Sequence, residues 1–213
     1  MKLPALVLAL PIVSLSAAVM AEGECPTKDD LAGLISVVYE GDRVENFMPA
    51  PAQPFLTMSV EIFPDGFRSV YLLTHGVFLQ EKGEYRDDAV VSGSTILYDY
   101  GVEDTVLPVP APLMQARLAV NVQSRDGDDV ERTDATYVWA GGPMTSFAIG
   151  TCTYNGFVMT LDMVGAGDQD GYRQELYYYL TELGIGLFVG SIESGQEDLT
   201  LPILISRSTD LVQ

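Results

Sequence analysis

The sequence contains few residues that could perform catalysis, and those few stand apart from any recognisable motif. The chain has one histidine, His75, and two cysteines. These are too few ligands for a zinc site of histidines and cysteines. Gly-x-Ser-x-Gly, His-Glu-x-x-His, Ser-x-x-Lys and the phosphate-binding glycine-rich loop are absent from the sequence. His75 precedes Gly76 at the end of a predicted strand, which is typical of a turn histidine. We therefore expect no catalytic residues, no cofactor and a protein that is not an enzyme.

Two acidic loops are the best candidates for metal binding. Asp126 and Asp128 belong to the first loop, and Asp168 and Asp170 belong to the second. Clustered carboxylates in flexible loops are typical calcium ligands. However, Glu131 occupies the position that an EF-hand reserves for glycine, and the second loop resembles a single copy of a calcium repeat that works only in arrays. Solvated hairpin turns explain both loops better, so we expect no bound metal.

Three consecutive tyrosines form the most unusual stretch of the sequence. In a strand, Tyr177 and Tyr179 point to one face and Tyr178 points to the other. Tyr177, Tyr179 and Trp139 are candidates for an aromatic face that stacks against a ligand or a partner. The alternative is that they pack across neighbouring strands, which aromatic side chains favour in any sheet. A glycosidase groove would also need aromatic walls, but 30 acidic residues give no means of selecting its carboxylate pair.

The elements that must position these side chains are strands. Residues 34–39 and 43–48 flank a Gly-Asp turn, which indicates a hairpin. Residues 49–54 are predicted as a proline-rich linker, and residues 81–94 as a polar loop. Further strands are predicted at 55–63, 67–73, 76–80, 95–100, 116–122, 132–139, 144–149, 151–164, 172–180, 185–192 and 200–205.

Helices are nearly missing from this pattern. Thr27 and Asp30 form a capping-box sequence that predicts one short N-terminal helical turn, ended by Gly33. Elsewhere the sequence shows no amphipathic run of three helical turns. The fold class is therefore all-β, an antiparallel meander of roughly a dozen strands. A curved sheet, a barrel and a sandwich all fit the pattern.

One short motif occurs twice. Asp65-Gly66-Phe67-Arg68 is echoed by Asp170-Gly171-Tyr172-Arg173, and each is followed by a glycine before a β-branched residue, at Gly76 and Gly184. An internal duplication of a three-stranded meander would produce this echo. The alternative is that an Asp-Gly turn before an aromatic residue is what hairpin corners commonly select.

The N-terminus has the features of an export signal. Lys2 precedes an apolar stretch that ends in Val19-Met20-Ala21, with small residues at the two positions that signal peptidase requires. We expect a signal peptide at 1–21, cleavage after Ala21, and a single β-rich domain at 22–213. The apolar stretch is too short, and too interrupted by proline, for a membrane anchor.

The charge of the chain excludes one class of partner. It has 30 acidic residues against 11 lysines and arginines, and removing Lys2 with the signal peptide changes the net charge from −19 to −20. Such a surface repels phosphates, so we expect no nucleic-acid binding. No later segment has 18 consecutive apolar residues, so we expect a protein that does not span the membrane.

Two cysteines in an exported chain pair most simply with each other. Cys25 and Cys152 would then tie the N-terminus to the middle of the fold. The alternatives are two free thiols or a redox site, but the sequence lacks Cys-x-x-Cys.

Several segments together resemble uncharacterised exported β-rich proteins of alphaproteobacteria. They are Cys25-Pro26 with Asp30-Leu31, Leu107-Pro108-Val109-Pro110, Ile149-Gly150-Thr151-Cys152 with Tyr154, and Tyr178-Tyr179 with Glu182-Leu183-Gly184. The resemblance implies a periplasmic location and a Cys25–Cys152 bridge. It implies no activity.

Three functions are compatible with these expectations. The first is a periplasmic or secreted protein that is not catalytic and binds a hydrophobic ligand or an envelope protein. The second is a structural module that pairs with a partner through a sheet edge. The third is a hydrolase based on carboxylates, which needs a cleft with converging acids.

Overall fold

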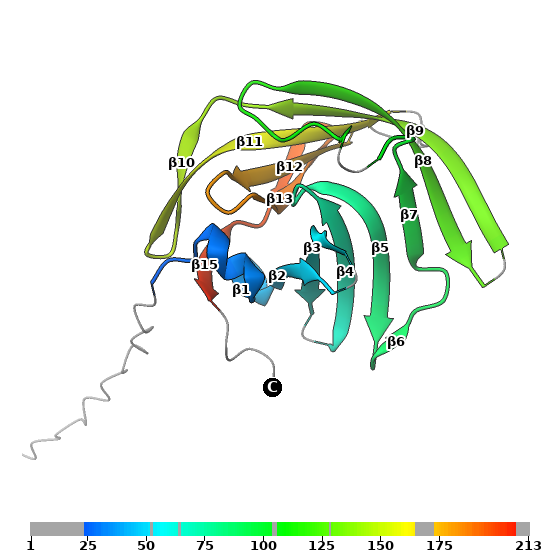
Figure 1. Ribbon diagram of the computed structural model, residues 1–213, viewed down its shortest axis with the longest axis horizontal. Coiled ribbons are helices and arrows are strands. Elements are labelled where there is room, and N and C mark those ends of the chain that lie inside the picture. The colour runs from blue at the N-terminus through cyan, green and yellow to red at the C-terminus, as the bar shows by residue number, and fades with distance from the viewer. Residues whose placement is uncertain are drawn as a thin grey trace, which may run out of the picture.

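The structure is a computed structural model that describes residues 24–51, 53–63, 65–103, 106–127, 129–164 and 173–207. Its strands form one antiparallel sheet, which curls strongly on itself (Figure 1). The sheet is not closed, and β14 and β15 are its two end strands. The all-β prediction is confirmed, and the arrangement is the curved sheet among the three that the sequence allowed. The described part of the chain forms fifteen strands rather than a dozen.

The bounds of the elements follow the chain. They are η1 Lys28–Ala32, β1 Ile35–Tyr39, η2 Glu40–Asp42, β2 Val44–Ala50, β3 Gln53–Ile62, β4 Phe67–Thr74, β5 Phe78–Arg86, β6 Ala89–Val90, β7 Thr95–Asp99, β8 Gln115–Asp126, β9 Asp129–Gly141, β10 Thr145–Ile149, β11 Cys152–Val164, β12 Arg173–Leu180, β13 Ile185–Glu193, β14 Gln196–Leu199 and β15 Pro202–Arg207. Along the sheet the strands have the order β14-β13-β12-β11-β9-β8-β7-β5-β4-β3-β2-β1-β15, with β10 paired to β11 and β6 paired to β5. Among the described residues, no helix is long and apolar enough to cross a membrane.

Two segments that were predicted as irregular belong to the sheet. Pro49 pairs with Thr57, so β2 runs into the expected linker and the chain turns at Pro51. The register shifts beside Pro49, and such an irregularity tolerates a residue that has no amide hydrogen. The expected polar loop at 81–94 contains the second half of β5 and all of β6. Polar residues in these strands misled the prediction, because most side chains in this part of β5 and both residues of β6 are half-buried or exposed.

The core consists of two apolar clusters. One lies between the first strands and the last ones, with Ile35, Val37 and Phe47 packed near Leu180 and Leu187. The second cluster includes Phe78, Trp139, Phe157, Met159 and Tyr179, which come from β5, β9, β11 and β12. Both clusters join strands that are far apart in sequence, so the curl of the sheet is stabilised by burial of apolar side chains.

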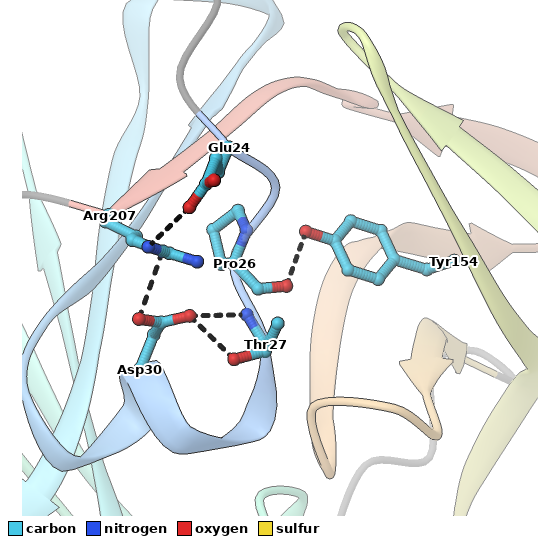
Figure 2. A network of polar contacts seen from close by, with 6 residues as sticks. All are labelled: Glu24, Pro26, Thr27, Asp30, Tyr154 and Arg207. Carbon is cyan, nitrogen blue, oxygen red and sulfur yellow. Dashed lines mark hydrogen bonds and ion pairs between the residues drawn. The ribbon is translucent and has the colours of Figure 1, made fainter.

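The N-terminal segment is fastened to the sheet by a disulfide and by a polar network. Cys25 is bonded to Cys152, with their Cα atoms 5.5 Å apart, as the sequence predicted. Arg207 of β15 contacts the carboxylates of Glu24 at 3.3 Å and Asp30 at 3.0 Å (Figure 2). Tyr154 of β11 donates its hydroxyl to the Pro26 carbonyl at 3.0 Å. The segment therefore connects the end strand β15 to β11.

The predicted helical turn is present at the end of this segment. The Asp30 carboxylate accepts hydrogen bonds from the backbone and the hydroxyl of Thr27, which completes the capping box. These bonds lower the pKa of Asp30 below its ordinary value. Asp30 therefore stays ionised and can bind Arg207 at the same time.

Two three-stranded meanders meet at their turns. In the first, β3, β4 and β5, the turn after β4 contains His75 and Gly76; in the second, β11, β12 and β13, the turn after β12 contains Gly184. The amide of Gly186 donates to the carbonyl of Gly76 at 2.9 Å, and a Cβ on Gly76 would lie 2.2 Å from the carbonyl oxygen of Gly184. The two glycines of the sequence echo thus lie against each other, while the duplication itself stays a prediction.

Candidate functional site

A cavity of about 310 Å³ lies between the two meanders. One wall comes from β2, β3, β4, β5 and β7, and the facing wall comes from β12 and β13. The charged side chains that line it are Arg43, Glu45, Glu61, Lys82, Arg173 and Glu175. The aromatic side chains that line it are Tyr71, Tyr98, Tyr177 and Phe188.

Strand register places the polar residues of the first wall side by side. Glu45 of β2 is directly opposite Glu61 of β3. Tyr71 of β4 is directly opposite Ser59 of β3 and Lys82 of β5. Because side chains alternate between the two faces of a sheet, residues at these positions all point to the inner face. Five polar side chains therefore gather where an ordinary sheet would bury apolar ones.

Glu45 is buried and has a hydrogen-bond partner on each carboxylate oxygen. Tyr39 donates its hydroxyl to Oε2 at 2.5 Å, and Ser59 donates its hydroxyl to Oε1. Burial raises the pKa of Glu45, while both hydroxyl groups and the Arg43 guanidinium oppose that rise. The same burial, together with the Glu45 charge, raises the pKa of Tyr39 well above its ordinary value. Tyr39 consequently remains a neutral donor.

Arg43 joins the two walls of the cavity. Its Nη2 donates to the carbonyl oxygen of Phe188 on β13 at 2.6 Å, and its Nη1 lies 3.4 Å from Oε1 of Glu61 on β3. The guanidinium stacks on the ring of Tyr39 at 3.7 Å, which is a favourable cation–π distance. The other oxygen of Glu61 accepts the hydroxyl of Tyr71 at 3.2 Å. Burial raises the pKa of Tyr71, so this hydroxyl also stays protonated.

The remaining charges follow a similar arrangement. Glu175 accepts the hydroxyl of Tyr177 at 2.6 Å and lies 3.8 Å from Arg173, whose side chain is half exposed at the edge of the cavity. Burial raises the pKa of Tyr177 well above its ordinary value. On β5, the Lys82 ammonium lies 3.0 Å from Glu84. Each of the three cavity carboxylates therefore accepts a hydrogen bond from a tyrosine hydroxyl.

The polar groups that line the cavity are largely paired with one another. Among the described residues that line the cavity there is no histidine or cysteine. The carboxylates are held by tyrosine hydroxyls, and Glu61 and Glu175 also lie beside arginines. In the described part of the chain, no group of three histidine, cysteine or acidic side chains is placed to hold a metal ion.

The aromatic residues singled out from the sequence occupy two different environments. Tyr177 lines the cavity, whereas Trp139 and Tyr179 are only 1% and 5% exposed and belong to the apolar cluster beside it. The ring of Trp139 lies 5.6 Å from that of Tyr177, and the Tyr179 hydroxyl donates to the His75 carbonyl at 3.3 Å. The packing alternative therefore describes Trp139 and Tyr179, and the ligand-face prediction is retained for Tyr177.

Asp126 and the single histidine are not among the residues that line the cavity. Asp126 accepts the Ser92 hydroxyl at 2.5 Å at the exposed end of β8. Asp128, Asp168 and Asp170 lie outside the described residues. The imidazole of His75 contacts the Leu107 carbonyl at 3.2 Å, which agrees with the expected turn histidine.

Sequence reasoning missed the charged residues of the cavity. A weak signal existed, because Ser59 and Glu61 share one face of the strand predicted at 55–63, opposite the face of Met58, Val60 and Ile62. Lys82 is one of only two lysines that follow the predicted signal peptide. Neither observation could show that these residues face the same space, since that depends on how β2–β5 pack against β12 and β13.

Comparison with known proteins adds no relative. No family model, no curated protein and no solved structure matches this chain.

Proposed function

We propose that the chain is an exported binding protein that is not catalytic and holds a small ligand in the cavity between the two meanders. The observation that carries this proposal is the cavity itself. Its volume of about 310 Å³ lies at the lower end of the range of small-molecule sites. Aromatic rings supply apolar contact area, and a few fixed polar groups converge on the same space, as in ligand pockets generally.

The export part of the proposal is supported by the two ends of the disulfide. Cys25 lies four residues after the expected cleavage site at Ala21, and its bond to Cys152 is of the kind that persists in oxidising compartments. A periplasmic or secreted location agrees with both features and with the resemblance to exported β-rich proteins.

Binding of a protein partner through a sheet edge is less well supported. The end strand β14 has only four residues, all exposed, and two of them are Glu197 and Asp198. Short, charged edge strands resist pairing with another chain. The other end strand, β15, is in contact with β10, which restricts access to its free edge. These features favour a ligand inside the curl of the sheet.

Native mass spectrometry of the protein purified from its exported form tests the proposal. We expect a bound small molecule that leaves on mild activation. Leu79→Trp should abolish this binding, because Leu79 lines the cavity and the larger indole side chain would fill the space. The control is Val90→Trp, since Val90 is exposed on β6, away from the cavity lining.

Two results would contradict the proposal. One is a ligand-free spectrum combined with no binding of a hydrophobic dye. The other is a ligand that the Leu79→Trp variant retains while its melting temperature equals that of the wild type.

A further inference from the structure

The cavity has a charge balance unlike that of the rest of the chain. The sequence has 30 acidic residues against 11 lysines and arginines, whereas the lining has three of each sign. Arg43, Lys82 and Arg173 are thus drawn from a small supply of bases. A lining without net charge discriminates against a ligand that carries net charge, because that ligand would be desolvated without full compensation.

The two signs are unevenly distributed within the cavity. On β2 and β3, the carboxylates of Glu45 and Glu61 share one cation, Arg43, which already contacts Glu61 and a backbone carbonyl. This end of the wall has a surplus of negative charge. On β5, the ammonium of Lys82 faces the cavity, whereas its partner Glu84 is not among the lining residues. An ammonium has three donors, so Lys82 keeps donors for a ligand.

The spacing of the strands separates these two ends. Lys82 lies on β5 and Glu61 on β3, with β4 between them. Neighbouring strands are about 4.8 Å apart, so the backbones that carry the two charges are roughly 10 Å apart across the sheet. A small molecule inside the curl can reach both.

Aromatic rings surround the space between the two ends. Tyr71, Tyr98 and Tyr177 line the cavity from three strands, together with Phe188. The faces of such rings attract organic cations, and carboxylates beside them strengthen the attraction. Burial raises the pKa of Tyr98 to about 12, so its hydroxyl stays neutral and adds no competing negative charge.

We propose that the ligand is a small zwitterion, whose ammonium group lies against Glu45, Glu61 and the aromatic rings and whose anionic group binds Lys82. The inference rests on the proposed function and specifies its ligand class. It follows from the juxtaposition of a carboxylate-rich end, an aromatic middle and a lysine ammonium with donors to spare in one cavity.

Three probes of similar size test the charge preference. Glycine betaine is a zwitterion, choline is a cation and pivalate is an anion. In isothermal titration calorimetry with the whole disulfide-bonded protein, we expect betaine to bind at least about tenfold more tightly than either of the others, which corresponds to about 1.4 kcal/mol.

Variants at the two ends should shift this preference in opposite directions. Lys82→Met should weaken betaine about tenfold and leave choline unchanged or tighter, whereas Lys82→Arg should restore betaine. Glu45→Gln should weaken betaine and choline but not pivalate. Lys28→Met and Glu197→Gln are the matched controls, because both side chains are exposed outside the cavity lining, and they should leave all three affinities unchanged.

The outcomes separate this inference from the function on which it rests. If a ligand binds but the preference does not follow the charge at position 82 in folded variants, the zwitterion is excluded and the binding function stands. If none of the three probes binds, the zwitterion is likewise excluded. The binding function itself fails only on its own test: native spectra free of ligand with no binding of a hydrophobic dye, or a ligand that the folded Leu79→Trp variant retains.

Discussion

Glu45 is an ionisable residue that is buried in the cavity wall, so its charged form is penalised by the loss of water. Its carboxylate is buried opposite that of Glu61, and two carboxylates directly opposite each other in a sheet are destabilising. Burial raises the pKa of Glu45 above its ordinary value of 4.5. The unfolded chain therefore releases this proton at lower pH than the folded protein does, so Glu45 stabilises the fold at low pH and loses that contribution as pH rises.

The change Glu45→Gln removes this titration and keeps a hydrogen-bonding side chain. We expect the free energy of unfolding of the wild type, measured relative to this variant, to fall as pH rises from about 4 to about 7. Urea unfolding of both proteins across that range measures the difference. Glu197→Gln is the control, because Glu197 is exposed and its variant should follow the wild type at each pH. A Glu45→Gln difference that is constant with pH would show that Glu45 does not titrate in this range.

At the residue scale, the sequence predicts which face of a strand a side chain occupies, but not what packs against that face. Strand alternation correctly places Tyr177 and Tyr179 on one face, yet Tyr177 lines the cavity and Tyr179 packs in the core. Tyr179 is buried in the same cluster as Val77 and Phe78 and contacts the turn after β4, about a hundred positions earlier, through its bond to His75. Alternation along one strand contains no information about which distant strand faces it.

At the scale of elements, the turn between β4 and β5 contacts the turn between β12 and β13 where the sheet curls on itself. Gly76 has φ of +68°, and a Cβ there would lie 2.2 Å from a backbone oxygen of the other turn. Gly66, in the hairpin between β3 and β4, has φ of +81°, but a Cβ there would meet nothing within 4 Å. The two glycines therefore share the left-handed conformation and differ in their surroundings.

Alanine substitutions at these two positions separate strain from contact. Gly66→Ala should cost only the strain of a left-handed residue, about 1–2 kcal/mol. Gly76→Ala should cost more, because backbone atoms must move apart and the hydrogen bond between Gly186 and Gly76 is disturbed. Chemical denaturation of both variants measures the two costs. Equal costs would mean that the contact between the meanders contributes little to stability.

Local turn chemistry explains why most strands could be predicted and why this contact could not. Gly41-Asp42, Asp65-Gly66 and the Gly-Gly-Pro sequence at 141–143 each end a strand through preferences that reside in the turn itself. The expected linker at 49–54 failed because Pro49 is accommodated at a register shift, which depends on the partner strand. Likewise, the approach of Gly76 to Gly184 depends on the path of the whole sheet.

At the scale of the molecule, charge is divided between surface and interior. Acidic residues occupy exposed turns such as those at Asp65, Asp87 and Asp88, while the cavity collects cations to match its carboxylates. The overall charge of −19 thus concerns solubility and repulsion of phosphates. It does not describe the site, where local balance decides what can bind.

The disulfide closes a long loop of the chain. Cys25 and Cys152 are separated by 127 positions, and a loop of that length restricts the unfolded chain by roughly 4–5 kcal/mol in the chain-entropy account. The bond also fastens the segment that carries Glu24 and Asp30, through which Arg207 holds the end strand β15 (Figure 2). Cutting it should therefore lower stability and loosen β15 together.

Replacing both cysteines by serine tests this coupling. We expect the free energy of unfolding to fall by several kcal/mol, and the amides of β15 to exchange with deuterium faster than those of β12. Arg207→Ala is the matched comparison, because it breaks the ion pairs and keeps the disulfide. Exposed ion pairs contribute about 1 kcal/mol or less, so its effect on global stability should be small while β15 still exchanges faster. Unchanged exchange in β15 in both variants would show that its pairing with β1 and its contact with β10 hold the end of the sheet.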